Sequence, residues 1–384
     1  MKSKHRIAAW RLFFGAALLR VLYWGACRDS PPPDVSDLLI EEELIPPEAN
    51  AYNSYMAAVE MYMRGTNYCE VVDDYMEGKQ VDEAALESIF DLNSPSFDLI
   101  HEGNCRDSMA SPLVKDCDAD LGTQGALLPL GKLMLARARF CHQKGQYPAA
   151  FSAYADIYRF AENLHTLPGS QIEFITGIML GEMAQKGFRQ LSLDPETPEH
   201  QLEEILRISP PGSGGSARAL TSNYFRSESL IKKVDADPAR AKGLLTGLTG
   251  SRAPLAWHEI MHRIFPRYLF QPNKTLEIQA DQYRRAISAA NFHCAPLEDI
   301  ETAGTGAAMK MYVPNGIGRA YCNLAEPVYG VLNIERSLAL EFETTRFVTA
   351  IQLYKRRHGD FPEDLRTLPP ETERVDGLGG NGLQ

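Results

Sequence analysis

The stretch that most constrains the fold is residues 131–191, where apolar residues recur at helical spacing. The spaced residues are Tyr147, Ala150, Tyr154, Ile157, Ala161 and Leu164. Steps of three and four residues place them on one face of a helix, and such a face must bury against a neighbour. This stretch therefore predicts packed helices.

Turn and cap residues divide the stretch into three helices. Gly145 suits the left-handed position after one helix, and Pro148 suits the first turn of the next. Ser170 with Glu173 has the form of a capping box that starts a third helix. That third helix carries a stripe of small residues, which predicts close approach of another helix. The stripe consists of Gly177, Gly181, Ala184 and Gly187.

The rest of the chain also has apolar residues at helical spacing and shows no convincing β alternation, so we expect an all-α fold. The clearest boundary is SPPGSGGS at residues 209–216. It predicts two helical lobes, residues 41–208 and 217–384, behind a proline-rich linker at 28–40. Expected helices outside the central stretch are 52–63, 82–90, 217–234, 254–265, a helix entered through 271–275, and 318–358 with a break at Pro327.

The N-terminus predicts a membrane anchor or signal segment over residues 1–27. A basic start, MKSKHR, precedes about 20 mostly apolar residues, enough for a helix to cross a bilayer. Arg11 and Arg20 interrupt this run and would have to reach the interfaces. With the basic end inside, the remainder would be extracytoplasmic, or periplasmic. Two alternatives stay open, an amphipathic surface helix and a signal in which Cys27 is lipidated.

Composition limits the function classes. The chain has 384 residues, of which 44% are hydrophobic, so a sizeable core is possible. Its net charge of −11 and the lack of a long basic face argue against a nucleic-acid partner.

Seven cysteines are present, none in a CxxC pair, which disfavours a structural zinc held by thiolates. Cys105 and Cys117 flank a polar segment and are the pair that we expect to be bonded. The alternative is separate thiols.

Residues 134–158 are similar to one tetratricopeptide unit. Small, turn and aromatic positions of that motif are matched by Ala138, Gly145, Tyr147, Ala150 and Tyr154. The family prefers Trp, Leu and Tyr at three positions that this chain fills with Met134, Arg137 and Cys141. No repeat of 34 residues follows, so the resemblance implies hairpin packing of this kind without a repeat array.

Residues 350–365 resemble the helix-then-turn segment of type II secretion pseudopilins. The markers predict a helix that ends on Gly359, a short helix opened by Pro362, and Phe361 and Leu365 folded back on Tyr354. The prepilin N-terminus, with its cleavage glycine and a glutamate in the apolar run, is absent. The chain is therefore not a pilin.

The order of features over residues 41–384 resembles an uncharacterised family of envelope proteins in planctomycete-like and verrucomicrobium-like bacteria. The shared markers are PPEANAY, GQYPAAF, QPNKT, NGIGR and a YxxxxGxxP tail. The family usually continues with Asp-Pro-Phe-x-Gly, whereas this chain ends VDGLGGNGLQ. The resemblance implies an envelope location and brings no known activity.

One motif could carry chemistry. His258, Glu259 and His262 form a literal HExxH, and on a helix both imidazoles could bind zinc while Glu259 polarises a bound water. Arg263 is charged where zinc peptidases of this kind keep an uncharged residue, and no third-ligand motif follows. The alternative is a structural role, in which the two histidines lie on a partly buried helix face.

The sequence therefore favours a membrane-anchored helical protein whose groove between helices takes a protein or peptide partner, without a cofactor. The competing hypothesis is a zinc-dependent hydrolase or peptidase that uses residues 258–262.

Overall fold

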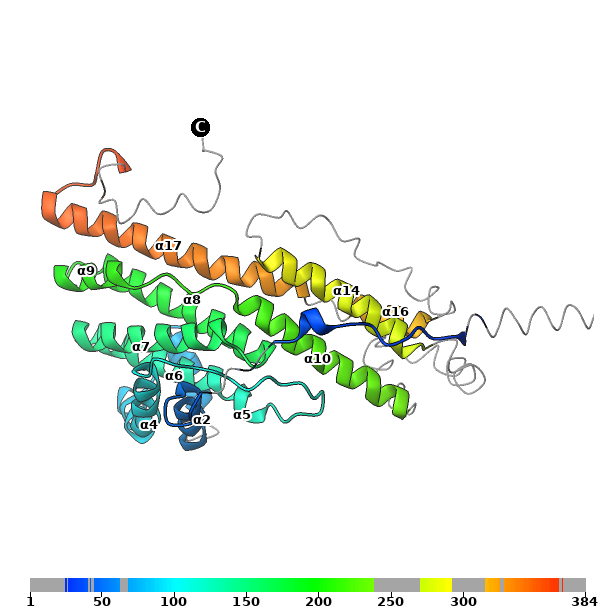
Figure 1. Ribbon diagram of the computed structural model, residues 1–384. Coiled ribbons are helices and arrows are strands. Elements are labelled where there is room, and N and C mark those ends of the chain that lie inside the picture. The colour runs from blue at the N-terminus through cyan, green and yellow to red at the C-terminus, as the bar shows by residue number, and fades with distance from the viewer. Residues whose placement is uncertain are drawn as a thin grey trace, which may run out of the picture. The chain divides into compact units, whose positions relative to one another are not determined.

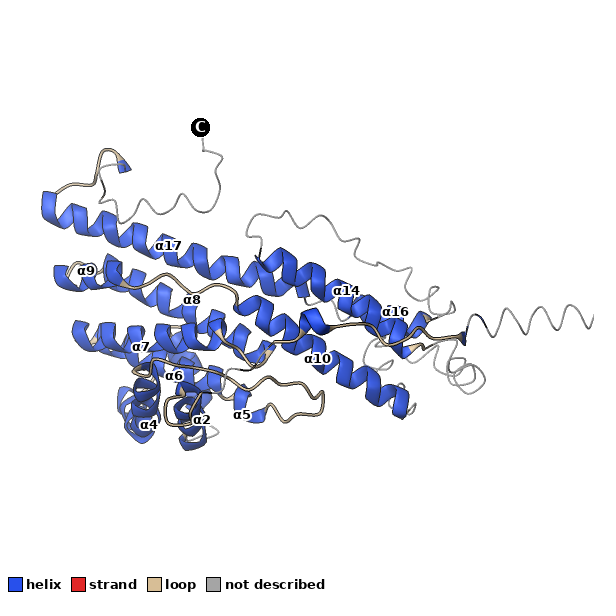
Figure 2. Cartoon of the chain, viewed as in Figure 1, coloured by secondary structure: helices blue, strands red, loops and turns tan. Residues whose placement is uncertain are grey.

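The computed structural model describes residues 25, 27–40, 42, 45–62, 68–237, 270–291, 315–324, 328–365 and 368. Every regular element in this part of the chain is a helix, which confirms the all-α fold class (Figure 2). The elements are η1 (Ser36–Leu38), α2 (Ala51–Met61), α3 (Tyr68–Met76), α4 (Glu83–Asn104), α5 (Gly122–Gly125), α6 (Leu127–Gln143), α7 (Tyr147–Thr166), α8 (Gln171–Leu193), α9 (Glu199–Arg207), α10 (Gly215–Ala236), α14 (Pro272–Asn291), α16 (Gly316–Leu324) and α17 (Val328–His358).

The chain divides into two compact units, and residues 209–216 lie inside the second of them. The first unit comprises Met1–Leu39, Tyr224–Ala286 and Pro296–Val328. The second comprises Ile40–Asn223, Ile287–Ala295 and Tyr329–Gln384. The second unit therefore joins segments that are far apart in the sequence.

Helices α6, α7 and α8 are the predicted hairpins and run side by side in Figure 1. All the spaced apolar residues of α7 after Tyr147 are at most 2% exposed, which confirms the predicted buried face. Gly145 has a φ of +71°, as the turn before α7 requires. Ser170 Oγ accepts the N–H of Glu173 at 3.2 Å, and Glu173 Oε2 accepts the N–H of Gly169 at 2.7 Å. Ser170 therefore caps α8 as predicted, and the Glu173 side chain reaches back to the residue before the cap.

The small-residue stripe on α8 does bring α7 close. A Cβ on Gly187 would lie 2.2 Å from the ring of Tyr154, and one on Gly177 would lie 2.7 Å from the carbonyl oxygen of Ala161. Neither distance is possible for a real side chain, so glycine is required at both contacts. This confirms the predicted close packing.

The first helices of the second unit pack beside α6 and α7 (Figure 1). Helix α4 begins at Glu83, close to the predicted start, with Asp82 as its cap, but it continues to Asn104 with Pro95 inside it. The prediction ended it near residue 90. Phe97 and Ile100 extend its buried face past the proline, and their burial outweighs the missing N–H. Helix α3 was not predicted.

Helix α17 packs along α8 through buried apolar residues such as Leu338 and Phe342 and through hydrogen bonds. Arg189 of α8 donates to the carbonyl oxygen of Glu341 and to Thr345 Oγ1, both at 3.1 Å. Beyond it, the hydroxyls of Ser192 and Thr349 lie 2.7 Å apart in a buried contact. α16 ends at Leu324 and α17 begins at Val328, and the expected break at Pro327 falls in residues 325–327, outside the described residues.

In the first unit, the proline-rich segment contacts α14. Asp29 caps this helix by accepting the N–H of Asn273 at 3.0 Å and that of Lys274 at 3.1 Å. Arg284 of α14 donates to both carboxylate oxygens of Asp37, at 2.7 and 2.8 Å. Residues 28–40 are therefore bound to the helix that the spacing after residue 271 predicted.

The C-terminal turn differs from the pseudopilin-like expectation. The helix does end on Gly359, which has a φ of +87°. Phe361 and Leu365, however, are 55% and 53% exposed, so their predicted packing on Tyr354 is wrong. The cation of Lys355 lies 4.3 Å above the ring of Phe361, and this contact replaces the predicted one.

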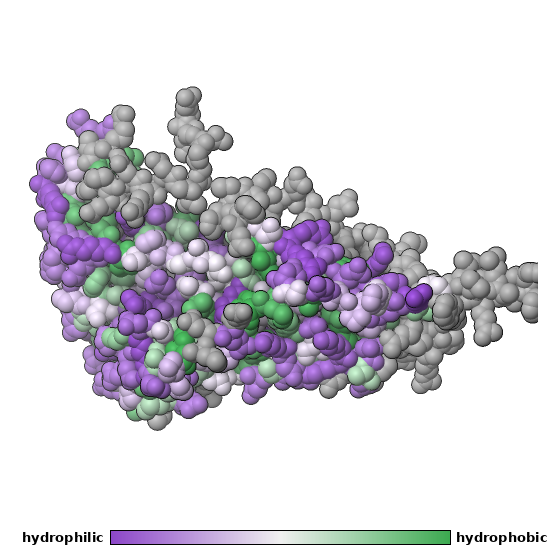
Figure 3. All heavy atoms as spheres, viewed as in Figure 1, coloured by the Kyte–Doolittle hydropathy of each residue, from purple (hydrophilic) through white to green (hydrophobic). Residues whose placement is uncertain are grey.

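Among the described residues, no helix combines the length and apolar composition that crossing a bilayer requires. The expected anchor over residues 1–27 lies outside them, apart from residues 25 and 27. Figure 3 shows a face on which hydrophilic residues predominate, with hydrophobic patches between them. This balance is ordinary for a folded protein surface.

Candidate functional site

The second unit contains a groove between α4, α6 and α7, which we call the α4–α7 groove. It encloses a cavity of about 220 Å³. Its lining residues are Phe97, Asp98 and His101 of α4, Met134, Arg137 and Cys141 of α6, and Ala149, Ser152, Ala153 and Asp156 of α7. The three α6 residues are those at which the chain departs from the tetratricopeptide pattern. The three residues that differ from the tetratricopeptide pattern therefore line this cavity.

Arg137 is the charged group of the groove with the most open donors. Its guanidinium carbon lies 5.1 Å from the ring centre of Phe97, a cation–π contact that holds the side chain against α4. Arg137 is exposed, and it forms no ion pair or hydrogen bond within the part of the chain that the structure describes. A planar guanidinium in this state can bind a carboxylate through two hydrogen bonds.

His101 and Asp156 also line the groove. Nδ1 of His101 lies 2.9 Å from Oδ1 and 3.1 Å from Oδ2 of Asp156. The hydrogen bond to Asp156, together with that residue's charge, raises the pKa of His101 above its ordinary value of 6.5. Asn104 Nδ2 donates to the carbonyl oxygen of Asp156 at 2.8 Å, and Tyr55 OH donates to Asn104 Oδ1 at 2.9 Å. The pair is thus fixed from α2 and α4.

Cys105 lies next to this pair. It is the C-cap residue of α4, it is exposed, and its Sγ lies 3.9 Å from Nε2 of His101. Cys105 and Cys117 are both free thiols, so the disulfide predicted between them is wrong. Each sulfur instead lies beside a polar neighbour within its own segment, His101 for Cys105 and Asp118 for Cys117.

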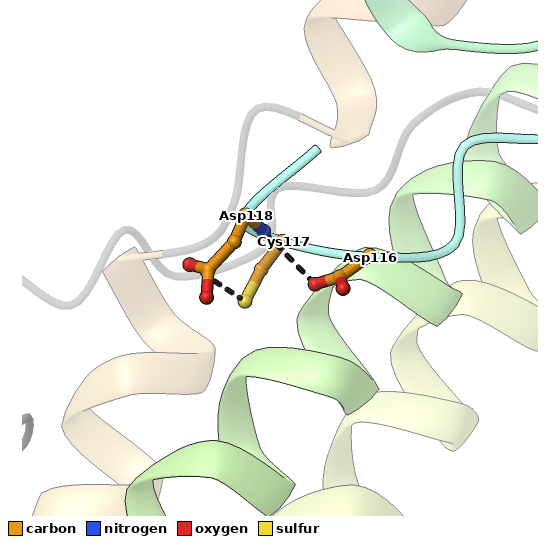
Figure 4. Close-up of side chains that lie close together, drawn as sticks. All are labelled: Asp116, Cys117 and Asp118. Carbon is orange, nitrogen blue, oxygen red and sulfur yellow. Dashed lines mark hydrogen bonds between the residues drawn. The ribbon is translucent and has the colours of Figure 1, made fainter. Parts of the chain in front are cut away.

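Asp116, Cys117 and Asp118 gather three possible metal ligands within 4.8 Å of one another. Figure 4 shows the sulfur of Cys117 directed at the carboxylate of Asp118 and the backbone N–H of Asp118 directed at Asp116, at 3.6 and 3.0 Å. The second contact is an Asx turn, which accounts for the arrangement in an exposed loop. We assign no metal to it.

A buried acid lies near the start of α8 and has a structural role. Glu173 is fully buried and accepts the hydroxyl of Tyr52 at 3.0 Å as well as the N–H of Gly169. Burial raises the pKa of its carboxyl group, against the hydrogen bonds that it accepts. These contacts fix the turn between α7 and α8 to α2.

A larger cavity of about 420 Å³ lies beside His165, lined mainly by small residues of the 211–213 turn and by residues of α17. His165 is 1% exposed, and its ring nitrogens face the carbonyl oxygens of Ala161 and Gly212 at 2.9 and 3.2 Å. A neutral imidazole has one N–H and donates to one of these two oxygens, and its position between backbone carbonyls makes this histidine a packing residue of the turn.

The predicted zinc ligands His258 and His262, with Glu259, lie outside the described residues, so the zinc hypothesis stays a prediction. Comparison with protein-family models, curated proteins and solved structures finds no match. The site therefore has to be interpreted from its own chemistry.

The sequence reasoning missed the cluster of His101, Cys105 and Asp156. The i, i+4 spacing of His101 and Cys105 is the signal that could have revealed it. That signal was lost because the predicted helix ended near residue 90, short of both residues. Asp156, on the polar face of α7, carries no local sign of its partner.

Proposed function

We propose that this protein is an interaction module that takes a protein or peptide segment into the α4–α7 groove. The observation that carries the proposal is Arg137, an exposed guanidinium held on the ring of Phe97 without a carboxylate partner among the described residues. Arginine and aromatic residues dominate the binding energy of protein interfaces. Met134 and two alanines of α7 supply an apolar, adaptable floor.

The charges of the groove suggest the kind of segment. Arg137 suits an acidic side chain, whereas Asp98, exposed on α4, suits a basic one. A cavity of about 220 Å³ takes one or two side chains, with the rest of the segment lying across the helices. The proposed ligand is therefore a short segment with an acidic, an apolar and a basic residue.

Selection of random displayed peptides on the full-length chain in detergent tests this proposal. We expect enriched peptides to combine acidic and basic residues, and Arg137→Glu to weaken their binding about tenfold or more. The control is Arg207→Glu on α9, whose side chain is 72% exposed and does not line the groove. Equal loss in both variants, or no enrichment, would count against the proposal.

We further propose the finer architecture that the sequence suggests. The α6–α7 hairpin packs in the tetratricopeptide manner, as the φ of Gly145 and the contact of Tyr154 with Gly187 support. The apolar run before residue 27 anchors two helical lobes on the periplasmic face of a membrane. Extraction of cell membranes at alkaline pH tests the anchor, because a peripheral protein would be released and an anchored one retained. Protease added from the periplasmic side tests the orientation.

The alternative function is zinc-dependent hydrolysis, for which the specific observation is the literal HExxH at residues 258–262. Metal analysis of the purified chain separates it from the first proposal. One zinc per chain that is lost in His262→Ala would support it, and a metal-free protein would remove it.

A further inference from the structure

Three side chains at the end of α4 and the middle of α7 form a nucleophile, base and acid in series. His101 directs Nε2 at the sulfur of Cys105, 3.9 Å away, and Nδ1 at the carboxylate of Asp156, 2.9 Å away. The side chain of His101 is 61% exposed and Cys105 is also exposed, so a substrate can reach both. A base that contacts the nucleophile and is oriented by a third group is the signature of nucleophilic catalysis.

We infer that Cys105 is a nucleophile served by His101, with Asp156 as the positioning residue, and that the site transfers the acyl group of an ester or thioester to water. Asp156 is itself fixed by Asn104, so the imidazole is held with Nε2 toward the sulfur. The sulfur contact is long, as in many sites without substrate, and shortens when the substrate binds. This activity goes beyond peptide binding and does not depend on it.

The reaction balances with water as the second reactant. His101 takes the proton of the Cys105 thiol, and the sulfur attacks the acyl carbon. The bond from that carbon to the leaving oxygen or sulfur breaks, and His101 returns the proton to the leaving group. Water, deprotonated by His101, then attacks the acyl-cysteine, which releases a carboxylic acid and restores the thiol.

The backbone around Cys105 explains why esters and thioesters, and not amides, are the expected substrates. The N–H of Cys105 donates to the carbonyl oxygen of His101 and that of Arg106 to Gly103, each at 3.1 Å. Neither N–H group is therefore free to stabilise the oxyanion of the tetrahedral intermediate. Amide hydrolysis depends strongly on that stabilisation. Oxygen esters and thioesters have better leaving groups and need less of this stabilisation.

Several charged groups set the charge of His101. Asp98 on the same helix and Asp156 from α7 both favour the imidazolium. From α6, Arg137 and Cys141 line the same groove. An imidazolium facing the sulfur with its positive charge makes the thiol more reactive, so the reaction of Cys105 with electrophiles reports directly on this contact.

The first test is alkylation of the full-length chain with iodoacetamide at pH 6.5, the ordinary pKa of histidine, with each cysteine followed by mass spectrometry. We expect Cys105 to react about tenfold faster than Cys117, whose sulfur faces the carboxylate of Asp118, and His101→Gln to abolish that difference. Asp156→Asn should slow the reaction of Cys105 at this pH, because less of His101 is then imidazolium, while the rate of Cys117 stays unchanged. Unchanged reactivity of Cys105 in His101→Gln would overturn the inference.

The second test is turnover of p-nitrophenyl acetate. We expect one acetyl group per chain on Cys105, hydrolysis that is lost in Cys105→Ser, and a loss of about a hundredfold in His101→Gln. Cys117→Ser should retain full activity. Because His101 and Cys105 are exposed, these variants should keep the melting temperature of the wild type. Acetylation spread over the cysteines without turnover would refute the proposed reaction, whereas the peptide-binding proposal would be unaffected.

Discussion

The two faces of α8 are packed in different ways. Toward α7 the contact is made by glycines and aromatic rings, with Gly187 against Tyr154. Toward α17 the apolar contact of Leu338 beside Gly181 is joined by buried hydrogen bonds, with Arg189 donating to Thr345 and Ser192 contacting Thr349. The first face joins helices that are neighbours in the chain, and the second joins residues more than 150 positions apart.

This difference distinguishes the contact between α7 and α8, at the centre of the second unit, from the contact that adds α17 to it. A glycine contact removes apolar area from water and leaves no room for variation, so it fixes the distance between α7 and α8. A hydrogen bond adds little net stability because water satisfies the same groups when the helices part. We therefore expect the α7–α8 pair to be the most stable part of the second unit and α17 to open first.

The largest effect should come from Gly187→Ala. The added Cβ would lie 2.2 Å from the ring of Tyr154, so α7 and α8 must separate or the ring must leave its position. We expect a loss of about 3 kcal/mol in the free energy of unfolding, measured by urea denaturation. Gly125→Ala is the matched control, since nothing lies within 4 Å of its added Cβ. Equal effects of the two substitutions would contradict close packing.

A smaller effect is expected from Arg189→Met on the other face. The side chain is 18% exposed and loses its bonds to the carbonyl oxygen of Glu341 and to Thr345 Oγ1. The expected loss is about 2 kcal/mol, and it should appear as earlier digestion of α17 by protease. Arg207→Met, with a side chain that is 72% exposed, should change stability by less than about 0.5 kcal/mol. A loss larger than that of Gly187→Ala would reverse the comparison.

Glu173→Gln should change how stability depends on pH. The pKa of Glu173 is raised in the folded state by burial, so the folded chain holds this proton more tightly than the unfolded chain. The stability that this proton adds to the folded chain is therefore fully present below the ordinary pKa of 4.5. It is lost as the pH rises above that value. Urea denaturation from pH 4 upward should show wild type losing stability relative to Glu173→Gln. A constant difference would show that the carboxyl group does not titrate in this way.

The smallest effect concerns the exposed pair in the groove. Asp156 raises the pKa of His101, so the pair stabilises the folded chain below pH 6.5. This stabilisation is lost as the pH rises through the raised pKa of His101. NMR titration should give a pKa above 6.5 in the wild type and a lower pKa in Asp156→Asn than in the wild type. A His101 that titrates identically in both proteins would exclude the contact.

The local part of the fold could be predicted from the sequence. The spacing of Tyr154 and its neighbours, the turn at Gly145 and the cap at Ser170 each act within a few residues, and all three are found as predicted. The extension of α4 past Pro95 could not be predicted, because burial of Phe97 against α6 is a tertiary effect. The groove was missed for the same reason.

Native-state hydrogen exchange tests the central comparison most directly. We expect the buried amides of α7 and α8 to exchange only through global unfolding. Those of α17 next to Thr345 and Thr349 should exchange through a partial opening with a lower free energy. Slower exchange in α17 than in α7 would contradict the account, because it would place the stable centre of the unit on the α17 side of α8.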